Sequence, residues 1–141
     1  MASADYKTKR NLILIYQITE DLRQYYKAKK PKELCNKILE QIGYIGQKYP
    51  NKLTDKQIQR LDKHIKAIGA KIHKTKPYVL TSIILLLADD LVALSEHTKK
   101  QYLIPLLESI AKLNNYADRT QNKTEVYEEI NKLVQYWYGL I

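Results

Sequence analysis

Residues 77–94 read PYVLTSIILLLADDLVAL, and this stretch decides the fold. In its middle only Thr81 and Ser82 interrupt the apolar side chains, so a helix formed here is apolar on every side. Such a helix has no single packing face and must be surrounded by other helices. A membrane-spanning helix needs about 20 apolar residues, whereas Asp89 and Asp90 end this run early. We therefore expect a central buried helix and no contact with a membrane.

Helical patterns flank this stretch on both sides. Apolar residues recur three or four positions apart in five further segments, at about residues 5–29, 31–49, 54–74, 98–113 and 122–140. Thr54–Gln57 and Thr98–Gln101 each have a threonine followed three residues later by a glutamine, the capping-box pattern of a helix start. Four glycines and four prolines are too few for a turn-rich all-β protein. The sequence predicts an all-α fold: a single-domain bundle of five or six helices over residues 1–141, around a central apolar helix at about residues 78–95.

The charge of the chain is unevenly distributed. Residues 1–76 hold 18 Lys and Arg against 7 Asp and Glu, a net charge of +11, whereas residues 77–141 hold 6 against 8, a net charge of −2. A basic half of this kind favours contact with a polyanion. The alternative is a lysine-rich solvated surface that only keeps the protein soluble. We expect the basic half to meet the polyanion, and the near-neutral half to form the core and to contact neighbouring subunits.

The most informative charge pattern lies in the segment that follows Thr54. An apolar stripe at helical spacing is formed by Ile58, Leu61, Ile65, Ile68 and Ile72. Five cations gather on the opposite side of the same helix, namely Lys56, Arg60, Lys63, Lys71 and Lys74. Such a line suits a nucleic-acid backbone, since each neutralised phosphate releases condensed counterions. The alternative is an ordinary exposed helix, whose polar face is often rich in lysine.

A second candidate cluster surrounds Pro31. Its cations are Lys27, Lys29, Lys30 and Lys32. Tyr25 and Tyr26 precede this cluster and are candidates for contact with a sugar or a base.

No glycine-rich phosphate loop, nucleophile elbow or paired-cysteine metal site occurs in the sequence, so we expect no enzymatic activity, no metal and no cofactor. The single cysteine, Cys35, lies beside an apolar stripe and is expected to be a small core residue. Arg60 and His64 are separated by three residues, fewer than in the Arg-to-His motif of helical RNA-cleaving domains, and we do not assign them that role. Asp89 and Asp90 lie about 100° apart on a helix, so one should face solvent and the other should pair with a lysine.

Two groups of residues are candidates for self-association. Leu12, Ile13 and Tyr16 fall off the apolar stripe of the first helix, which favours either burial between two layers of the fold or a contact between subunits. The second group is the C-terminal aromatic residues. Trp137 falls on the apolar face of the last helix, and the tyrosines that flank it are otherwise expected at the edge of the core with wet hydroxyls: Tyr127, Tyr136 and Tyr138.

The sequence thus favours a non-enzymatic nucleic-acid-binding protein that grips the phosphate backbone of DNA or RNA without sequence specificity. A packaging, coat or small accessory subunit of a nucleoprotein assembly fits the division into a basic and a near-neutral half. The alternative is a protein-interaction module, such as a small viral or mobile-element protein that binds and inhibits an acidic host protein. One cysteine and the absence of a secretory signal predict an intracellular location or a virion.

Overall fold

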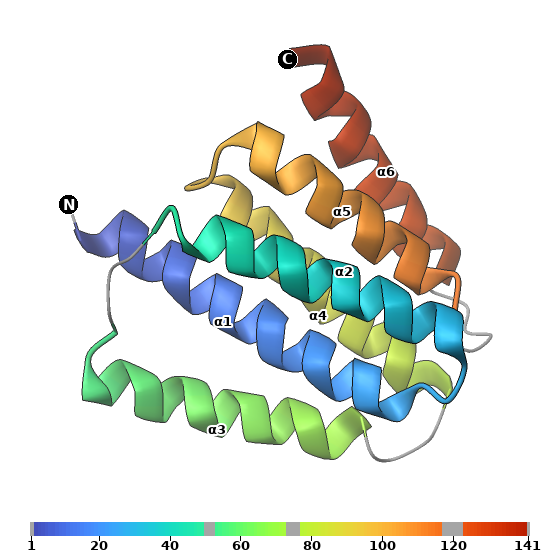
Figure 1. The fold of residues 1–141 in the computed structure, drawn as a ribbon, viewed down its shortest axis with the longest axis horizontal. Helices are drawn as coiled ribbons and strands as arrows, with labels where there is room; N and C mark the ends of the chain where they lie inside the picture. The colour runs from blue at the N-terminus through green and yellow to red at the C-terminus, as the bar shows by residue number, and fades with distance from the viewer. Residues whose placement is uncertain (1, 50–52, 73–76, 117–122, 141) are drawn as a thin grey trace.

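The computed structural model describes the backbone of residues 2–49, 53–72, 77–116 and 123–140, and this part of the chain forms six helices without a strand. Within these helices the side chains of residues 2–5, 71, 72, 77–82, 84, 85, 88, 123–127, 129, 130, 137 and 140 are not described. The helices are α1 (Ala2–Tyr25), α2 (Lys29–Gly46), α3 (Asp55–Ile72), α4 (Pro77–Ser95), α5 (Lys100–Asn114) and α6 (Lys123–Leu140) (Figure 1). The predicted all-α helical bundle is confirmed.

Four of the helices form a ring, and the other two pack on its outside. Each helix of the ring contacts the next, in the order α1, α2, α5 and α4, and α4 closes the ring against α1. α3 covers the edge between α1 and α4, and α6 covers the edge between α5 and α4 (Figure 1). α4 therefore contacts four other helices, which is the surrounding that its apolar sequence requires. No helix in the described part of the chain is long and apolar enough to cross a membrane.

The centre of the bundle is a stripe on α4. Ile83, Leu87, Leu91 and Leu94 are each at most 1% exposed. Full burial is also expected for residues on the other sides of this helix, but Leu86 is only partly buried and packs against the edge of the core. The side chain of residue 84, on the side opposite Leu86, lies outside the described residues.

Both halves of the chain build the core, which corrects the expectation that the near-neutral half forms it. α1 contributes Ile15, Ile18 and Leu22, and α2 contributes Ile38 and Ile45, all at most 1% exposed. The reason is geometric: a helix apolar on every side needs partners around its whole circumference, and the basic half supplies α1 and α3 for this purpose. The basic half is thus part of the packed bundle and not a separate arm.

The two predicted capping boxes have different outcomes. At the start of α3, the backbone N–H of Thr54 donates to Gln57 Oε1 (2.7 Å) and the Gln57 N–H donates to Thr54 Oγ1 (3.3 Å), so this capping box is confirmed. The prediction at Thr98 is wrong. α5 begins one residue later, with Lys99 as its N-cap and no side-chain cap, while Thr98 is only 7% exposed. Its hydroxyl is turned into the protein and cannot serve the first turn.

α3 is seated differently from what its apolar stripe predicts. Leu61 and Ile68 are buried, at 6% and 3% exposure, but Ile58 is 51% exposed. α3 has only α1 and α4 as neighbours, so it lies at the edge of the bundle and cannot bury a wide stripe. It approaches α1 closely at Gly69, where a Cβ atom would stand 3.3 Å from Asp21 Oδ2.

The packing of α4 predicts a large difference between two of its apolar residues. Replacing the fully buried Leu87 by alanine should lower the free energy of unfolding by about 2–5 kcal/mol, because a cavity is left in the core. The matched control Val92→Ala removes a side chain that is 53% exposed and should cost less than about 0.5 kcal/mol. Urea unfolding followed by circular dichroism measures both values, and equal losses would contradict this packing of α4.

The seating of α3 predicts a second contrast within one helix. Leu61→Ala should destabilise the protein by about 2–4 kcal/mol, whereas Ile58→Ala should cost less than about 1 kcal/mol, since only the first side chain is buried. The same urea titration applies. A cost at Ile58 as large as that at Leu61 would mean that α3 buries the stripe read from the sequence instead.

Candidate nucleic-acid interface

Three cations of the predicted line are presented to solvent by α3. Lys56, Arg60 and Lys63 are all exposed and lie away from the buried Leu61 and Ile68. Within the described residues none of the three forms an ion pair. Their charges are thus available to an external anion.

The neighbouring cation on α3 behaves differently. Lys66 Nζ lies 2.9 Å from Asp62 Oδ2, and this pair neutralises one charge of each sign on the helix surface. Of the last two members of the predicted line, Lys74 and the side chain of Lys71 lie outside the described residues.

The second predicted cluster lies at the turn from α1 into α2. Its four cations are exposed, namely Lys27, Lys29, Lys30 and Lys32. Lys29 is 3.8 Å from the carboxylate of Glu33, but both side chains are well exposed, so this contact contributes little. Lys30, Lys37 and Lys112 line a cavity of about 470 Å³ between the start of α2 and the end of α5. This cavity extends the cluster onto α5.

The two tyrosines beside this cluster have unequal exposure. Tyr26 is only 7% exposed and belongs to the core, whereas Tyr25 is partly exposed. Their rings contact each other edge to face at 5.9 Å. Tyr26 has no free face for a base, so contact with a sugar or base is left to Tyr25.

The two clusters lie towards opposite ends of α1. Arg60 lines a pocket together with Tyr6 and Arg10 near the start of α1, whereas the second cluster follows the end of this helix. α3 runs alongside α1, and its close approach at Gly69 is to Asp21, near the carboxyl end of α1 (Figure 1). The carboxyl end of α3 therefore points towards the turn that carries the second cluster.

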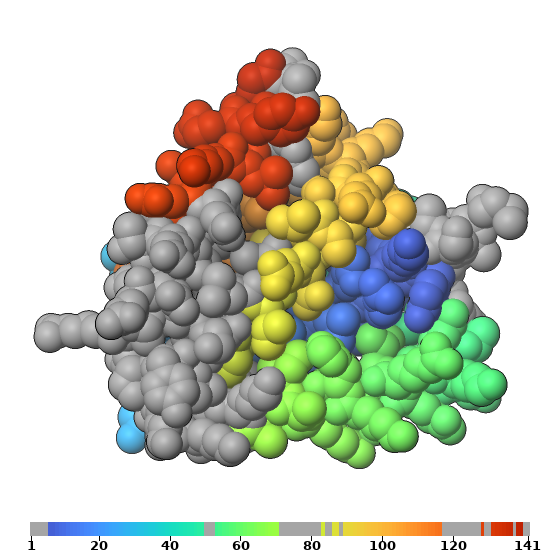
Figure 2. Space-filling model, turned by 180° about the vertical axis from the view of Figure 1, so that it is seen from behind, coloured from blue at the N-terminus to red at the C-terminus, as the bar shows by residue number. Residues whose placement is uncertain are grey.

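A pocket of about 360 Å³ lies between α1, α3 and α4, and we call it the α1–α3–α4 pocket. Figure 2 shows the face on which these helices meet, with α1 between α3 and α4. Arg60 belongs both to the exposed line on α3 and to the lining of this pocket. The pocket is lined by Tyr6, Arg10, Asn11 and Leu14 of α1, Gln57, Arg60, Leu61 and His64 of α3, and Asp90 of α4.

Asp90 is the acidic residue of this pocket, and its environment is unusual. Burial raises the pKa of its carboxyl to about 6, the charge of Arg10 opposes this rise, and Asp89 adds to it. Asp89 is exposed, as expected for one of the two aspartates. The prediction that the other aspartate pairs with a lysine is wrong, because the cation that acts on Asp90 is Arg10. The pocket therefore contains a carboxyl group that is partly protonated near pH 6.

Three residues of this pocket were not predicted from the sequence as site residues. Arg10 and Asn11 were not singled out, and His64 was considered but given no role. A signal was present, because Thr8 and Asn11 continue the buried stripe of α1 towards its start at the same spacing as Ile15 and Ile18. Polar residues at core positions of a helix call for an explanation. Thr8 and Asn11 are 0% and 1% exposed.

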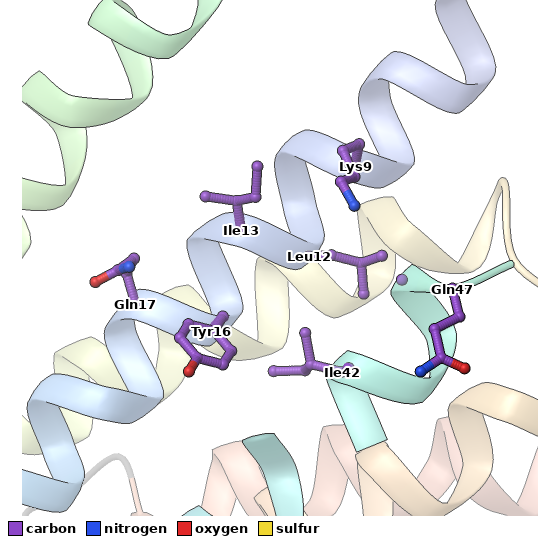
Figure 3. A pocket seen from close by; sticks show the side chains of 9 residues that line it. Lys9, Leu12, Ile13, Tyr16, Gln17, Ile42 and Gln47 are labelled. Carbon is purple, nitrogen blue, oxygen red and sulfur yellow. The ribbon is translucent and has the colours of Figure 1, made fainter. Parts of the chain in front are cut away.

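The residues predicted for self-association line a separate groove between α1 and α2, with a volume of about 380 Å³ (Figure 3). Leu12 is buried at 2% exposure, Ile13 is partly exposed and Tyr16 is 41% exposed. On the α2 side the groove stays open at Gly43, where an added Cβ atom would meet nothing within 4 Å. We call this the α1–α2 groove. Leu12 is buried between helices, as the first alternative expects, whereas Ile13 and Tyr16 remain at least partly exposed and could contact a subunit, as the second expects.

The C-terminal aromatic residues are seen only in part. Tyr136 and Tyr138 are 62% and 51% exposed, and the Tyr138 hydroxyl donates to Glu108 Oε1 at 2.5 Å. The side chains of Tyr127 and Trp137 lie outside the described residues. Tyr138 is thus tied to α5, while Tyr136 is the more available of the two.

Two further groups bear on catalysis. Among the described residues no three His, Cys, Asp or Glu side chains gather in a way that could hold a metal ion. Cys35 is fully buried, and burial raises the pKa of its thiol to about 12. A thiol of this kind carries almost no thiolate near neutral pH and is not a nucleophile.

Comparison of the chain with protein-family models, with curated proteins and with solved structures finds no match.

The environment of Asp90 predicts a pH-dependent gain in stability for Asp90→Asn. The raised pKa means that the folded protein binds more protons than the unfolded chain between the ordinary value of 3.8 and about 6, so stability falls as pH rises through this range. Asp90→Asn removes this loss. Above pH 7 the free energy of unfolding of the variant should be about 1–2 kcal/mol higher than that of the parent, after allowance for solvent screening. Near pH 4 the two proteins should be about equally stable. Urea unfolding at several pH values measures the difference. The exposed Asp89→Asn is the control, and a pH-independent difference for Asp90→Asn would contradict the prediction.

Proposed function

We propose that this protein is a non-enzymatic nucleic-acid-binding protein that grips the phosphate backbone without sequence specificity. The observation that carries the proposal is the exposed line of Lys56, Arg60 and Lys63 on α3, whose charges are not used in ion pairs among the described residues. A role as a packaging, coat or small accessory subunit of a nucleoprotein assembly agrees with the net charge of +9.

The geometry of α3 supports a backbone contact. Lys56 and Lys63 are seven residues apart, which is about 10 Å along a helix axis. A duplex carries one phosphate charge per about 1.7 Å of its axis, so a line of this length meets several phosphates. Lysine and arginine side chains neutralise these phosphates and release counterions, and this gain does not depend on the base sequence.

The non-enzymatic part of the proposal rests on the chemistry of the described groups. Cys35 is buried with a raised pKa, and Asp90 is the one carboxylate among the described residues that line the α1–α3–α4 pocket. A general acid–base pair would have to combine Asp90 with His64, and no hydrogen bond joins them in the described structure. If the pure protein shortened an oligonucleotide and the His64→Ala variant did not, the proposal that the protein is not an enzyme would be overturned.

A protein partner is the second candidate, and the α1–α2 groove favours it. The groove is apolar in its middle, and at its edge Tyr16 is exposed and Ile13 is partly exposed in the described structure. A second copy of the chain or an acidic host protein would use this groove or the basic face of α3. Under this alternative the protein binds no nucleic acid, even at low salt.

A charge-reversed α3 tests the first proposal. Replacing Lys56, Arg60 and Lys63 together by glutamate should weaken binding to every sequence alike, because the contacts are with phosphates. Each lost contact should flatten the slope of log affinity against log salt by about 0.9 on duplex or about 0.7 on single strands, so three contacts change it by roughly 2 to 3 units. Fluorescence anisotropy at a series of salt concentrations measures this slope.

The matched control changes the net charge by the same amount on the other half of the chain. Lys99, Lys100 and Lys132 are exposed, and their replacement by glutamate should leave the salt slope almost unchanged. Equal effects of the two triple variants would mean that net charge alone governs binding. Absence of binding by the parent protein at low salt would put the protein-partner candidate first.

A further inference from the structure

The α1–α3–α4 pocket presents arginines from two different helices. Arg10 comes from α1 and Arg60 from α3, and both side chains line the pocket. A guanidinium group offers its N–H donors in a planar fork that matches two oxygens of a phosphate or carboxylate. Arg10 is also oriented from a second side, since its guanidinium carbon lies 5.8 Å from the centre of the Tyr6 ring. Two arginines that converge from separate helices favour an anionic ligand.

The amide nitrogen of the buried Asn11 is a hydrogen-bond donor that has no acceptor among the described residues. Its side-chain oxygen accepts hydrogen bonds from Arg10 Nε and Nη2, both at 3.3 Å. Arginine has only donors, so this contact fixes the oxygen of Asn11 towards Arg10 and leaves its amide nitrogen as the remaining donor. That nitrogen has no hydrogen-bond partner among the described residues, although Asn11 is 99% buried and lines the pocket. Buried donors are normally satisfied, and an oxygen atom of a ligand would satisfy this one.

The remaining features of the pocket favour a compact anion. The carboxyl of Asp90 has a pKa of about 6, so its repulsion of an anion is reduced in mildly acidic solution. The volume of about 360 Å³ lies at the lower end of the range of small-molecule sites, enough for a phosphate with part of a nucleoside. A phosphate in the middle of a strand carries one negative charge and must enter and leave the pocket with chain on both sides. A terminal phosphate carries up to two charges and needs only one way in.

We propose that the α1–α3–α4 pocket binds a phosphomonoester, either the terminal phosphate of a nucleic-acid strand or the phosphate of a free mononucleotide. The strand-end form rests on the proposed function, because Arg60 then joins the backbone contacts of α3 to the captured end. The free-nucleotide form stands independently of it. In both forms Arg10 and Arg60 hold the phosphate oxygens, and Asn11 donates from the floor of the pocket.

The test with strands compares end groups on one sequence. Short single strands with a 5′-phosphate, a 3′-phosphate or hydroxyls at both ends, each labelled on an internal base, are titrated with the full chain at one salt concentration. One of the phosphorylated strands should bind about tenfold more tightly than the hydroxyl strand, as expected for charge-assisted hydrogen bonds to a phosphate. The comparison uses the parent protein alone, so it does not depend on whether a variant folds.

Variants then assign the preference to the pocket. Arg10→Gln should reduce it to less than about twofold while leaving affinity for the hydroxyl strand nearly unchanged. Lys7→Gln is the matched control, because Lys7 is an exposed cation of the same helix that does not line the pocket, and the preference should persist. A preference that survives in Arg10→Gln would overturn the assignment to this pocket.

The test with free nucleotides uses adenosine 5′-monophosphate, inorganic phosphate and adenosine in isothermal titration. Binding of the monophosphate but not of adenosine supports the proposal. Binding of both with equal affinity would identify a base site and overturn it. Equal binding of phosphorylated and hydroxyl strands, together with no binding of the monophosphate, would overturn the pocket proposal and leave the proposed function intact. Binding of the monophosphate without binding of any strand would keep the pocket and overturn the proposed function.

Discussion

The contact of α4 with four other helices is the constraint on which the rest of the structure depends. Its stripe of Ile83, Leu87, Leu91 and Leu94 can leave water only if helices stand on several sides of it. α1 and α5 do so within the ring, and α3 and α6 close the remaining edges from outside. The basic half of the chain therefore cannot be a detached tail. Its cations are held at fixed positions because the helices that carry them are needed for the core.

α3 shows how this constraint also creates the candidate site. Its two neighbours bury Leu61 and Ile68, and the partial exposure of Ile58 follows from the seating that brings Arg60 and His64 to the side of α1 and α4. Both residues stay exposed and stand at the edge of the pocket. Some apolar burial is thus given up on α3, and a polar pocket stands where the three helices meet.

Much of the fold follows from local sequence, whereas the pocket does not. The capping box at Thr54 and Gln57 was predictable because both of its hydrogen bonds lie within one turn. The similar pattern at Thr98 failed, since this side chain is buried and α5 begins without a side-chain cap. The exposure of Lys56 and Lys63 followed from helical periodicity. The meeting of Arg10 with Asp90 joins residues far apart in the chain, and only tertiary packing brings them together.

The burial of Cys35 has a consequence for how motions of the bundle can be observed. It is the only thiol of the chain, it lies among the core side chains of α1 and α2, and its raised pKa suppresses the reactive thiolate. An alkylating reagent can therefore modify the native protein only when the bundle opens and the thiol reaches water. The rate of labelling then reports the frequency of that opening, without an engineered probe. A ligand that holds α1 against its neighbours would slow this chemical clock, even if it binds far from the sulfur atom.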